Sequence, residues 1–425
     1  MALLQQRPLA IDLFAGCGGM SLGLEAAGFD VVGAVEVDPI HALVHHFNFP
    51  YGVTLCQDIS QLNSNDLLAK IRAKGFTADI ELVAGGPPCQ GFSMMGKRQI
   101  EDPRNQLIFE YLRLIKEIQP KYFIFENVAG MAAGQHKTFL HQLLKKFDEI
   151  GYHVVESGSV LDASLYGAPQ KRKRLFILGY RHDVQPINYP HITTPMETDK
   201  VKVREAIADL ADIVVHRGVD QGIDVKKLDY SNFRNNFSVK NGGVFSLCHQ
   251  RHVGNTVWGH LGSNHTQKSI DRFASAELGK VEKVSRFLKL HPDGLANTLR
   301  AGTPSERGSH TAPRPIHYKI PRCISVREAA RLHTFPDWFQ FHRKIWHGFR
   351  EIGNAVIPIL AKEIADEIIQ ALGYESAQLM PRILDQSETV HEQVLNYKVA
   401  EACEYWGISR DVLPKRKRKV LSQVS

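Results

Sequence analysis

The chain has few cysteines, and their spacing excludes the sites that cysteines usually build. There are six among 425 residues, and no two of them form a CxxC pair. Structural zinc sites and disulfide frameworks need closely or regularly spaced cysteines, so the sequence indicates neither. We therefore expect no metal site, and reduced thiols in a cytoplasmic protein.

Long hydrophobic runs are also missing. No uninterrupted apolar stretch approaches the roughly 20 residues of a membrane-spanning helix, and residues 1–8 lack the pattern of a signal peptide. With 43% hydrophobic residues, the composition is typical of a soluble globular protein of two or three domains. We expect no association with a membrane.

Excess charge of one sign is small over most of the sequence. The net charge is +7, and five of the positive charges lie in the run 415–419, which leaves +2 for the rest. A footprint on nucleic acid would therefore need a local concentration of basic side chains. The terminal run is typical of a solvated tail, with phosphate binding as the alternative.

What is present begins with the signals of a nucleotide-binding α/β domain. A short apolar strand over residues 10–14 leads into the glycine turn 15–19 and then a helix to Ala27. Glycines at such a turn let the backbone approach a ligand, and the helix offers unpaired N–H groups. A strand over 31–35 then ends in Glu36-Val37-Asp38, and a third element ends at Asp58-Ile59, so that acids lie where a ribose needs acceptors.

The glycine spacing narrows the choice of nucleoside. Ser21 occupies the place of the third glycine of the GxGxxG fingerprint, which binds the pyrophosphate of dinucleotides. The sequence therefore argues against NAD or FAD. S-adenosylmethionine, a nucleoside without phosphate, is the predicted cofactor.

A cysteine follows the next predicted strand directly. The apolar run 80–84 is terminated by Gly85-Gly86-Pro87-Pro88, and Cys89 comes next, at the sheet edge where ligands bind in open α/β folds. A thiolate there is a potent nucleophile. An inert buried thiol is the alternative for a single cysteine, but the surrounding motifs favour the nucleophile. The polar stretch 94–105 is predicted to be a loop hinged on glycines.

Strand and helix patterns continue to alternate up to about residue 180. A strand over 122–125 ends in Glu126, and a carboxylate at such an apolar edge can have a raised pKa and act as an acid. Arg172 and Arg174 enter the strand 175–178 on one face, so both could point into one site. The alternation predicts an α/β fold with a doubly wound, mostly parallel sheet.

The pattern changes after residue 180. Residues 190–320 are rich in polar residues and glycine with weak periodicity, which predicts a second, smaller and loop-rich domain. Ser325 and Glu328 form a capping box that starts a helix. The stretch 353–358 is expected to open a last helix that packs back onto the first domain. Residues 400–409 bear a faint similarity to a helix-turn-helix.

Taken in order, the motifs resemble those of the cytosine-5 DNA methyltransferase family, of the kind found in bacterial and phage restriction-modification systems. The match covers most of residues 9–372. The matching stretches are Asp12-Leu13-Phe14-Ala15-Gly16-Cys17-Gly18-Gly19, Glu36-Val37-Asp38, Asp58-Ile59, Pro87-Pro88-Cys89-Gln90, Glu126-Asn127-Val128, Gln170-x-Arg172-x-Arg174, Arg327-Glu328-Ala329-Ala330-Arg331-Leu332 and Gly353-Asn354-Ala355-Val356.

The resemblance implies a methyltransferase fold that binds S-adenosylmethionine at the strand ends. Phe14 is expected to stack on adenine, Glu36 to hold the ribose hydroxyls, and Asp58 with Ile59 to contact adenine. The remaining cofactor-binding residues that we expect are Gly16, Gly18, Pro88, Leu107 and Asn354.

The resemblance also implies the roles of the catalytic residues. Addition of the Cys89 thiolate to C6 of cytosine would turn C5 into a nucleophile. Glu126 would protonate or hydrogen-bond N3, Arg174 would hold O2, and Arg172 would orient the loop and backbone. A stacked base cannot reach these groups, so the cytosine must flip out of the duplex. Gln90 and Ser93, on the loop after Cys89, are expected to contact DNA.

Three domains follow from the resemblance. Residues 1–189, completed by 348–372, form the catalytic and cofactor-binding domain. Residues 190–347 contain the target-recognition domain and hinge, expected to read base edges in the major groove. Residues 373–425 are an extension with the basic tail. The implied partner is double-stranded DNA, with the enzyme either paired with a restriction endonuclease or acting alone, and the implied state is a monomer.

Three other functions compete with this interpretation. An RNA (tRNA) cytosine-5 methyltransferase would share the fold, but Ser93 and the long second domain favour DNA. A DNA-binding regulator with an inactive methyltransferase body is disfavoured because Cys89, Glu126 and both arginines are intact. Methylation of an exocyclic amine is disfavoured because its Asp/Asn-Pro-Pro-Tyr/Phe motif is absent.

Overall fold

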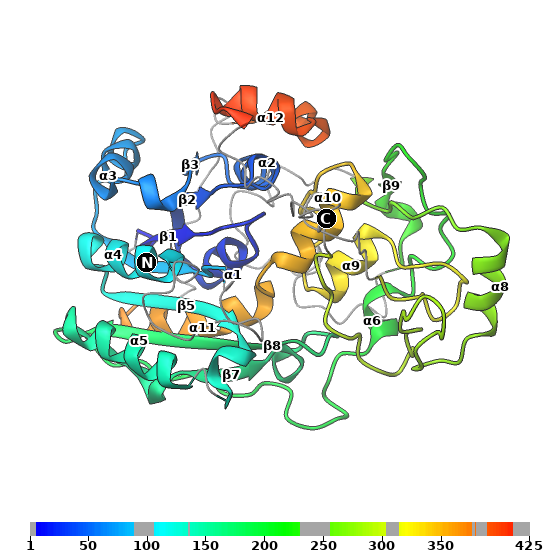
Figure 1. Cartoon of the computed structure of the whole chain (residues 1–425), viewed down its shortest axis with the longest axis horizontal. Coiled ribbons are helices and arrows are strands. Elements are labelled where there is room, and N and C mark those ends of the chain that lie inside the picture. The colour runs from blue at the N-terminus through cyan, green and yellow to red at the C-terminus, as the bar shows by residue number, and fades with distance from the viewer. Residues whose placement is uncertain are drawn as a thin grey trace, which may run out of the picture.

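The computed structural model describes residues 6–88, 106–134, 137–229, 256–302, 314–375, 379 and 389–410. An eight-stranded sheet forms its centre, and the main order of strands is β3-β2-β1-β4-β5-β8-β6, with β7 paired to β8 (Figure 1). The strands are β1 Leu9–Leu13, β2 Asp30–Glu36, β3 Val53–Cys56, β4 Ile80–Gly85, β5 Tyr122–Val128, β6 Tyr152–Val154, β7 Ser159–Asp162 and β8 Lys173–Arg181.

The first five strands are parallel, and of the last three only β8 runs against them. β1 pairs in parallel with β2 and β4, β2 with β3, and β4 with β5. β8 is antiparallel to β5, β6 and β7. The predicted α/β fold with a mostly parallel sheet is therefore confirmed, whereas the sequence pattern did not indicate the reversal of β8 or the presence of β7.

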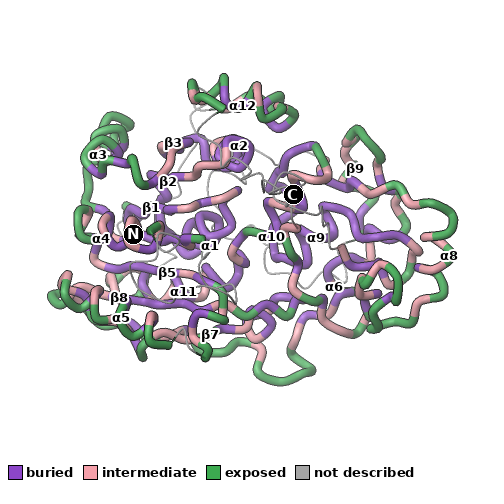
Figure 2. Tube along the Cα trace, viewed as in Figure 1, coloured by how far each residue is buried: buried purple, intermediate pink, exposed green. Residues whose placement is uncertain are grey.

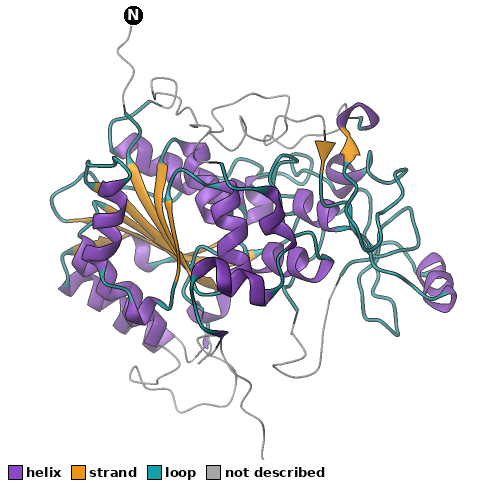
Figure 3. Cartoon of the chain, turned by 90° about the horizontal axis from the view of Figure 1, so that it is seen from above, coloured by secondary structure: helices purple, strands orange, loops and turns teal. Residues whose placement is uncertain are grey.

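Helices cover both faces of the sheet, as the view from above shows (Figure 3). Alternate residues of each strand face opposite layers, so Phe123 and Phe125 join one core while Ile124 joins the other. The first core also includes residues of three helices, and the second includes residues of two. These helices are α3 Ser64–Ala73, α4 Gln106–Ile118 and α5 Lys137–Glu149 on one face, and α1 Gly19–Ala27 and α11 Pro358–Ala371 on the other.

Helix α11 packs closely against α1, as expected for a last helix that returns to the first domain. The contact needs a glycine in α1, because a Cβ at Gly23 would lie 2.4 Å from the Cβ of Ala361 and 2.6 Å from the carbonyl of Pro358. The start of α11 differs from the prediction. Gly353 and Asn354 end helix α10 (Ile345–Asn354), and Pro358 alone opens α11, at the first turn where proline needs no N–H partner.

The described residues between 190 and 347 contain little regular structure. They lie to one side of the sheet, with α8 at the far end (Figure 1). Their elements are α6 Val203–Ile207, β9 Ile223–Asp224, β10 Thr256–Val257, α8 Gln267–Ser275 and α9 Val326–Leu332, with β9 and β10 pairing as a two-stranded sheet. The predicted capping box is present, because Ser325 and Glu328 accept from each other's backbone N–H.

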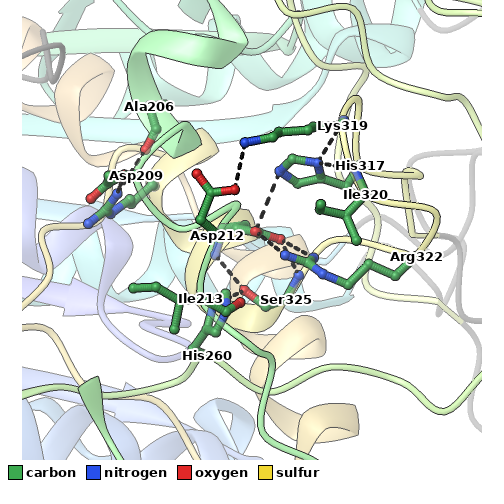
Figure 4. Close-up of polar contacts among 12 residues, drawn as sticks. Ala206, Asp209, Asp212, Ile213, His260, His317, Lys319, Ile320, Arg322 and Ser325 are labelled. Carbon is green, nitrogen blue, oxygen red and sulfur yellow. Dashed lines mark hydrogen bonds and ion pairs between the residues drawn. The ribbon is translucent and has the colours of Figure 1, made fainter. Parts of the chain in front are cut away.

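A buried polar cluster anchors this loop-rich part to α9 (Figure 4). Both carboxylate oxygens of Glu328 accept from Arg322, each at 2.7 Å. Although burial opposes the charge, Arg322 and nearby histidines hold the pKa of Glu328 at about 2. Arg331, also fully buried, pairs with Asp337 and Asp209. Since removing one partner of such a pair leaves an uncompensated charge, the cluster favours a single arrangement of these loops.

The C-terminal part adds one more helix, α12 (Val399–Trp406), which lies over α2 (Pro39–Asn48). The indole N–H of Trp406 donates to the Pro39 carbonyl at 3.1 Å. The suggested helix-turn-helix stretch 400–409 forms most of this helix and the turn after it at Gly407, and no second α-helix follows it within the described residues; the basic run 415–419 lies outside them. Buried residues follow the strands and α1, whereas α3, α8 and α12 present exposed surfaces (Figure 2). Among the described helices, none has the length and apolar character of a membrane span.

Candidate active site

The carboxyl ends of the parallel strands bring most of the predicted site residues to one edge. Reading along the sheet from β3, this edge presents Asp58, Glu36, Phe14, Pro88 and Glu126, each just after or at the end of its strand. Leu13 pairs with Val35 and with Gly85, and Gly85 pairs with Phe125. The predicted cofactor residues and the predicted acid therefore lie along one continuous edge.

Glu126 forms an ion pair with Arg174. Its Oε1 lies 3.0 Å from Nε of Arg174, and the antiparallel pairing of β5 with β8 places Val128 opposite Arg174. Burial raises the pKa of Glu126, although Arg174 and Arg172 both oppose the shift. The carboxyl group can therefore carry a proton more readily than an exposed glutamate.

The turn after β4 lies directly against this acid. A Cβ on Gly86 would lie 2.9 Å from Oε2 of Glu126, so a glycine lets the turn pass the carboxylate. The side-chain amide of Asn127 donates to the Pro87 carbonyl at 3.0 Å and fixes the turn to β5. Pro88 is exposed at the end of this described segment. Cys89, Gln90 and Ser93 lie outside the described residues.

Arg172 has a different position from Arg174. It precedes β8 and is 3% exposed, and its guanidinium donates to the carbonyls of Leu299, Gly353 and Ala355 at 2.9 to 3.0 Å. The hydrogen bonds of Arg172 therefore go to backbone carbonyls, while its charge still lowers the pKa of Glu126, and the prediction that both arginines serve one site stays a prediction. Arg172 ties three backbone segments together behind the site, which fits the orienting role that the resemblance implied.

Glu36 has the geometry of a hydrogen-bond acceptor held in place. Its two carboxylate oxygens accept from the backbone N–H groups of Gly16 and Asp38, each at 2.8 Å. Burial is the main cause that raises its pKa to about 7. Space for a Cβ is open at Gly16, whereas at Gly18 a Cβ would lie 2.3 Å from the ring of Phe49. Gly16 thus faces open space, and Gly18 packs against Phe49 and His45 at the end of α2 while it caps α1.

The other predicted cofactor residues surround this acid. Asp58 accepts from the N–H and hydroxyl of Ser60, at 2.9 and 2.8 Å, which shapes the turn that holds the buried Ile59. Phe14 has a left-handed φ of 61° where the chain leaves β1. Leu107 is half-buried in the first turn of α4, and Asn354 is exposed at the end of α10.

One residue of this region was not predicted. Arg350 of α10 forms an ion pair with Asp38 Oδ2 at 2.7 Å, while Asp38 Oδ1 caps α2 by accepting from Ile40 and His41. Asp38 also donates its backbone N–H to Glu36, so Arg350 fixes the loop that holds the acid. No local pattern indicates a contact between residues 312 positions apart.

This fold and edge define an α/β methyltransferase of the Rossmann-like class. A family model described as C-5 cytosine-specific DNA methylase matches residues 9–370, and the chain belongs to that family. It is a DNA (cytosine-5-)-methyltransferase of the type II restriction-modification kind.

Similar proteins span nearly the whole chain. Type II methyltransferase M.XorII of Xanthomonas oryzae is 43% identical and covers 97% of this chain and 96% of its own length. Type II methyltransferase M.DdeI of Desulfomicrobium norvegicum is 33% identical, covering 84% and 88%. A prophage-encoded DNA modification methyltransferase of E. coli superposes with a TM-score of 0.72 at 31% identity, over 86% of this chain and 99% of that chain. Dnmt2 of S. pombe, at 17% identity over 87% and 100% and a TM-score of 0.53, shares the fold.

Proposed function

We propose that this enzyme methylates C5 of one cytosine within a specific sequence of double-stranded DNA, using Cys89 as the nucleophile, Glu126 as the acid and S-adenosylmethionine as the methyl donor. The observation that supports this most directly is the edge where Glu126, its partner Arg174 and the turn leading to Cys89 meet. At this edge an acid, Glu126, and a positive charge, Arg174, lie beside the turn that precedes Cys89 in the sequence.

The groups at the strand ends fit the proposed cofactor. Glu36 is an acceptor whose carboxylate is already oriented by two backbone N–H groups, and open space lies beside Gly16. Asp58, Ile59 and Phe14 would hold the adenine end, with Pro88, Leu107 and Asn354 as further contacts, while Gly18 supports the turn. When bound, S-adenosylmethionine supplies an electrophilic methyl group.

The protein residues would act on the cytosine in a fixed order. The Cys89 thiolate adds to C6 while Glu126, whose pKa burial raises, protonates or hydrogen-bonds N3. Arg174 places positive charge beside the ring as negative charge develops on it. Arg172 holds the surrounding backbone through its three carbonyl bonds. After methyl transfer a base removes the C5 proton and the thiolate leaves.

A duplex library tests the proposed reaction. Purified protein and S-adenosylmethionine are incubated with random-sequence duplexes, and methylcytosine is mapped by deamination sequencing. We expect modified cytosines in one short shared context, and none with Cys89→Ser, which should still bind the cofactor. Near-normal methylation by that variant would refute the nucleophile, and an unmodified library beside modified RNA would refute the substrate.

We further propose that residues 190–347 select the target sequence and that residues 1–189 with 348–372 perform the chemistry. The loop-rich segment lies to one side of the sheet and meets the site where Leu299 accepts from Arg172. Exchanging the segment with that of M.DdeI should transfer the target of that enzyme; an unchanged target would contradict the assignment. We expect a monomer acting on duplex DNA, with Gln90 and Ser93 at the flipped base, and pairing with an endonuclease for the same sequence.

A further inference from the structure

A cluster of two histidines and one aspartate lies on the surface. It is found where β5 begins and β8 ends, at the opposite end of the strands from the active site. Asp148, His153 and His182 are all exposed, and each offers one ligand atom, with all three atoms within 4.8 Å of one another. We propose that this cluster is a site for a divalent cation of the zinc class. The site is independent of the methyl-transfer reaction.

Regular structure fixes the relative positions of the three residues. Asp148 lies in the last turn of α5, and its carbonyl accepts from Gly151, whose φ of 97° reverses the chain into β6. His153 lies in β6, opposite Tyr180 of β8. His182 directly follows β8 and donates its backbone N–H to Gly151 at 3.2 Å. The two histidines are therefore diagonal neighbours on one face, and the aspartate lies beside them.

The distances require only a small movement to close around an ion. Nε2 of His182 lies 3.9 Å from Oδ1 of Asp148, and the two imidazole rings lie 4.1 Å apart at their centroids. Bonds of about 2.0–2.2 Å from zinc to nitrogen or oxygen place tetrahedral ligand atoms roughly 3.3–3.5 Å apart. The largest gap to be closed, up to about 1.5 Å for a pair at the 4.8 Å limit, is within reach of side-chain rotation at these exposed positions.

The donor set indicates which ion the site would take. Two imidazoles with one carboxylate suit Zn²⁺, Co²⁺ or Ni²⁺, and water would complete a four-coordinate site. Magnesium and calcium prefer oxygen ligands only, so a single carboxylate is a poor site for them. The nearby Asp183 forms an ion pair with Arg181 at 2.6 Å.

Binding of a cation would link the outermost strand of the sheet, β6, to its neighbours. β6 is the last strand in the main order, and the cluster joins it to α5 and to the end of β8. Arg174 lies at the opposite end of the same nine-residue strand. A cation at the cluster therefore stabilises the folded protein through its binding free energy, while the methyl-transfer site stays unchanged.

Titration of the metal-free full-length protein with ZnCl₂ by calorimetry, together with thermal unfolding, tests the proposal. We expect one ion per chain and a Tm that rises with zinc but not with MgCl₂. His153→Ala and His182→Ala should each weaken binding at least about tenfold, since losing even an outer partner of a metal ligand costs 10- to 100-fold.

The matched control is His141→Ala, which removes an exposed histidine two turns earlier in α5. This control should bind zinc like the unaltered protein, and all variants retain the same cysteines, so zinc bound by thiols affects them equally. Metal-free His182→Ala should also keep the unaltered melting temperature and methylation rate. Equal zinc affinity in the unaltered protein and all three variants would overturn the assignment. So would the absence of binding at about 100 µM ZnCl₂.

Discussion

Replacing Glu351 of α10 by glutamine should stabilise the protein at neutral pH. This glutamate is 1% exposed, its Oε2 accepts from the backbone N–H of His342 at 3.1 Å, and in the described part of the chain its Oε1 has no hydrogen-bond partner. Burial, with repulsion from Asp38, raises its pKa from an ordinary 4.5 to about 8, although Arg350 and the His342 N–H oppose the shift.

The sign of the effect follows from proton binding. Below pH 4.5 both folded and unfolded chains carry the proton, so burial costs nothing through ionisation. As the pH rises towards 8 the unfolded chain releases it while the folded chain keeps it, and stability falls. Each pH unit of that window costs about 1.4 kcal/mol, so the loss at pH 7 is about 3 kcal/mol.

Glutamine keeps the shape of the side chain and the acceptor for His342, and it removes the titration. The amide and the neutral acid both place a donor at the unpartnered position, so that cost is common to both. Glu351→Gln should therefore gain about 3 kcal/mol at pH 7, but less than about 1 kcal/mol at pH 5.

Urea unfolding followed by circular dichroism at both pH values measures this difference. The control is Glu404→Gln, which makes the same substitution at an exposed position of α12. A gain that is equal at pH 5 and pH 7, or a loss at both, would show that Glu351 ionises normally in the folded protein.

Three further predictions concern the site and its supports. Glu126→Gln should slow the single-turnover rate at least about a hundredfold and remove the decline of that rate at high pH; an unchanged rate would exclude the acid role. Arg350→Ala should raise the cofactor KM about tenfold through the loss of its charged bond to Asp38, with kcat unchanged and partial rescue by Arg350→Lys; an unaltered KM would contradict this. Trp406→Phe should lower the unfolding free energy by about 1 kcal/mol through the lost bond to Pro39, as measured in urea, and a neutral result would show that α12 does not need this bond.

Signals that are local in the chain predicted the structure well. Apolar runs ending in glycine or an acid identified β1, β2, β4 and β5, and the capping box at Ser325 identified the start of α9. These features depend on neighbours within a few residues. Motif order then assigned the edge on which Glu36 and Glu126 lie.

Contacts between distant segments could not be predicted in the same way. Strand direction depends on the path of the connecting chain, so the reversal of β8 left no mark in its apolar pattern. The alternation around Arg172 and Arg174 does not specify which carbonyls lie nearby, so it could not predict the hydrogen-bond partners of Arg172. Gly353 was assigned to the start of the last helix, yet it ends α10, where a Cβ would lie 2.2 Å from the backbone nitrogen of Ala301.

The contact between α1 and α11 has a consequence for synthesis of the protein. Residues Leu360, Ile364 and Ile368 complete the core beneath the sheet that begins at Leu9, so one face of the sheet lacks its cover until the ribosome has passed Ala371. The nascent chain therefore holds all of residues 190–347, the segment that we propose to select the target, before the methyltransferase core can close. Under that proposal, a newly made molecule acquires the ability to modify DNA only after the segment that selects the target has been synthesised.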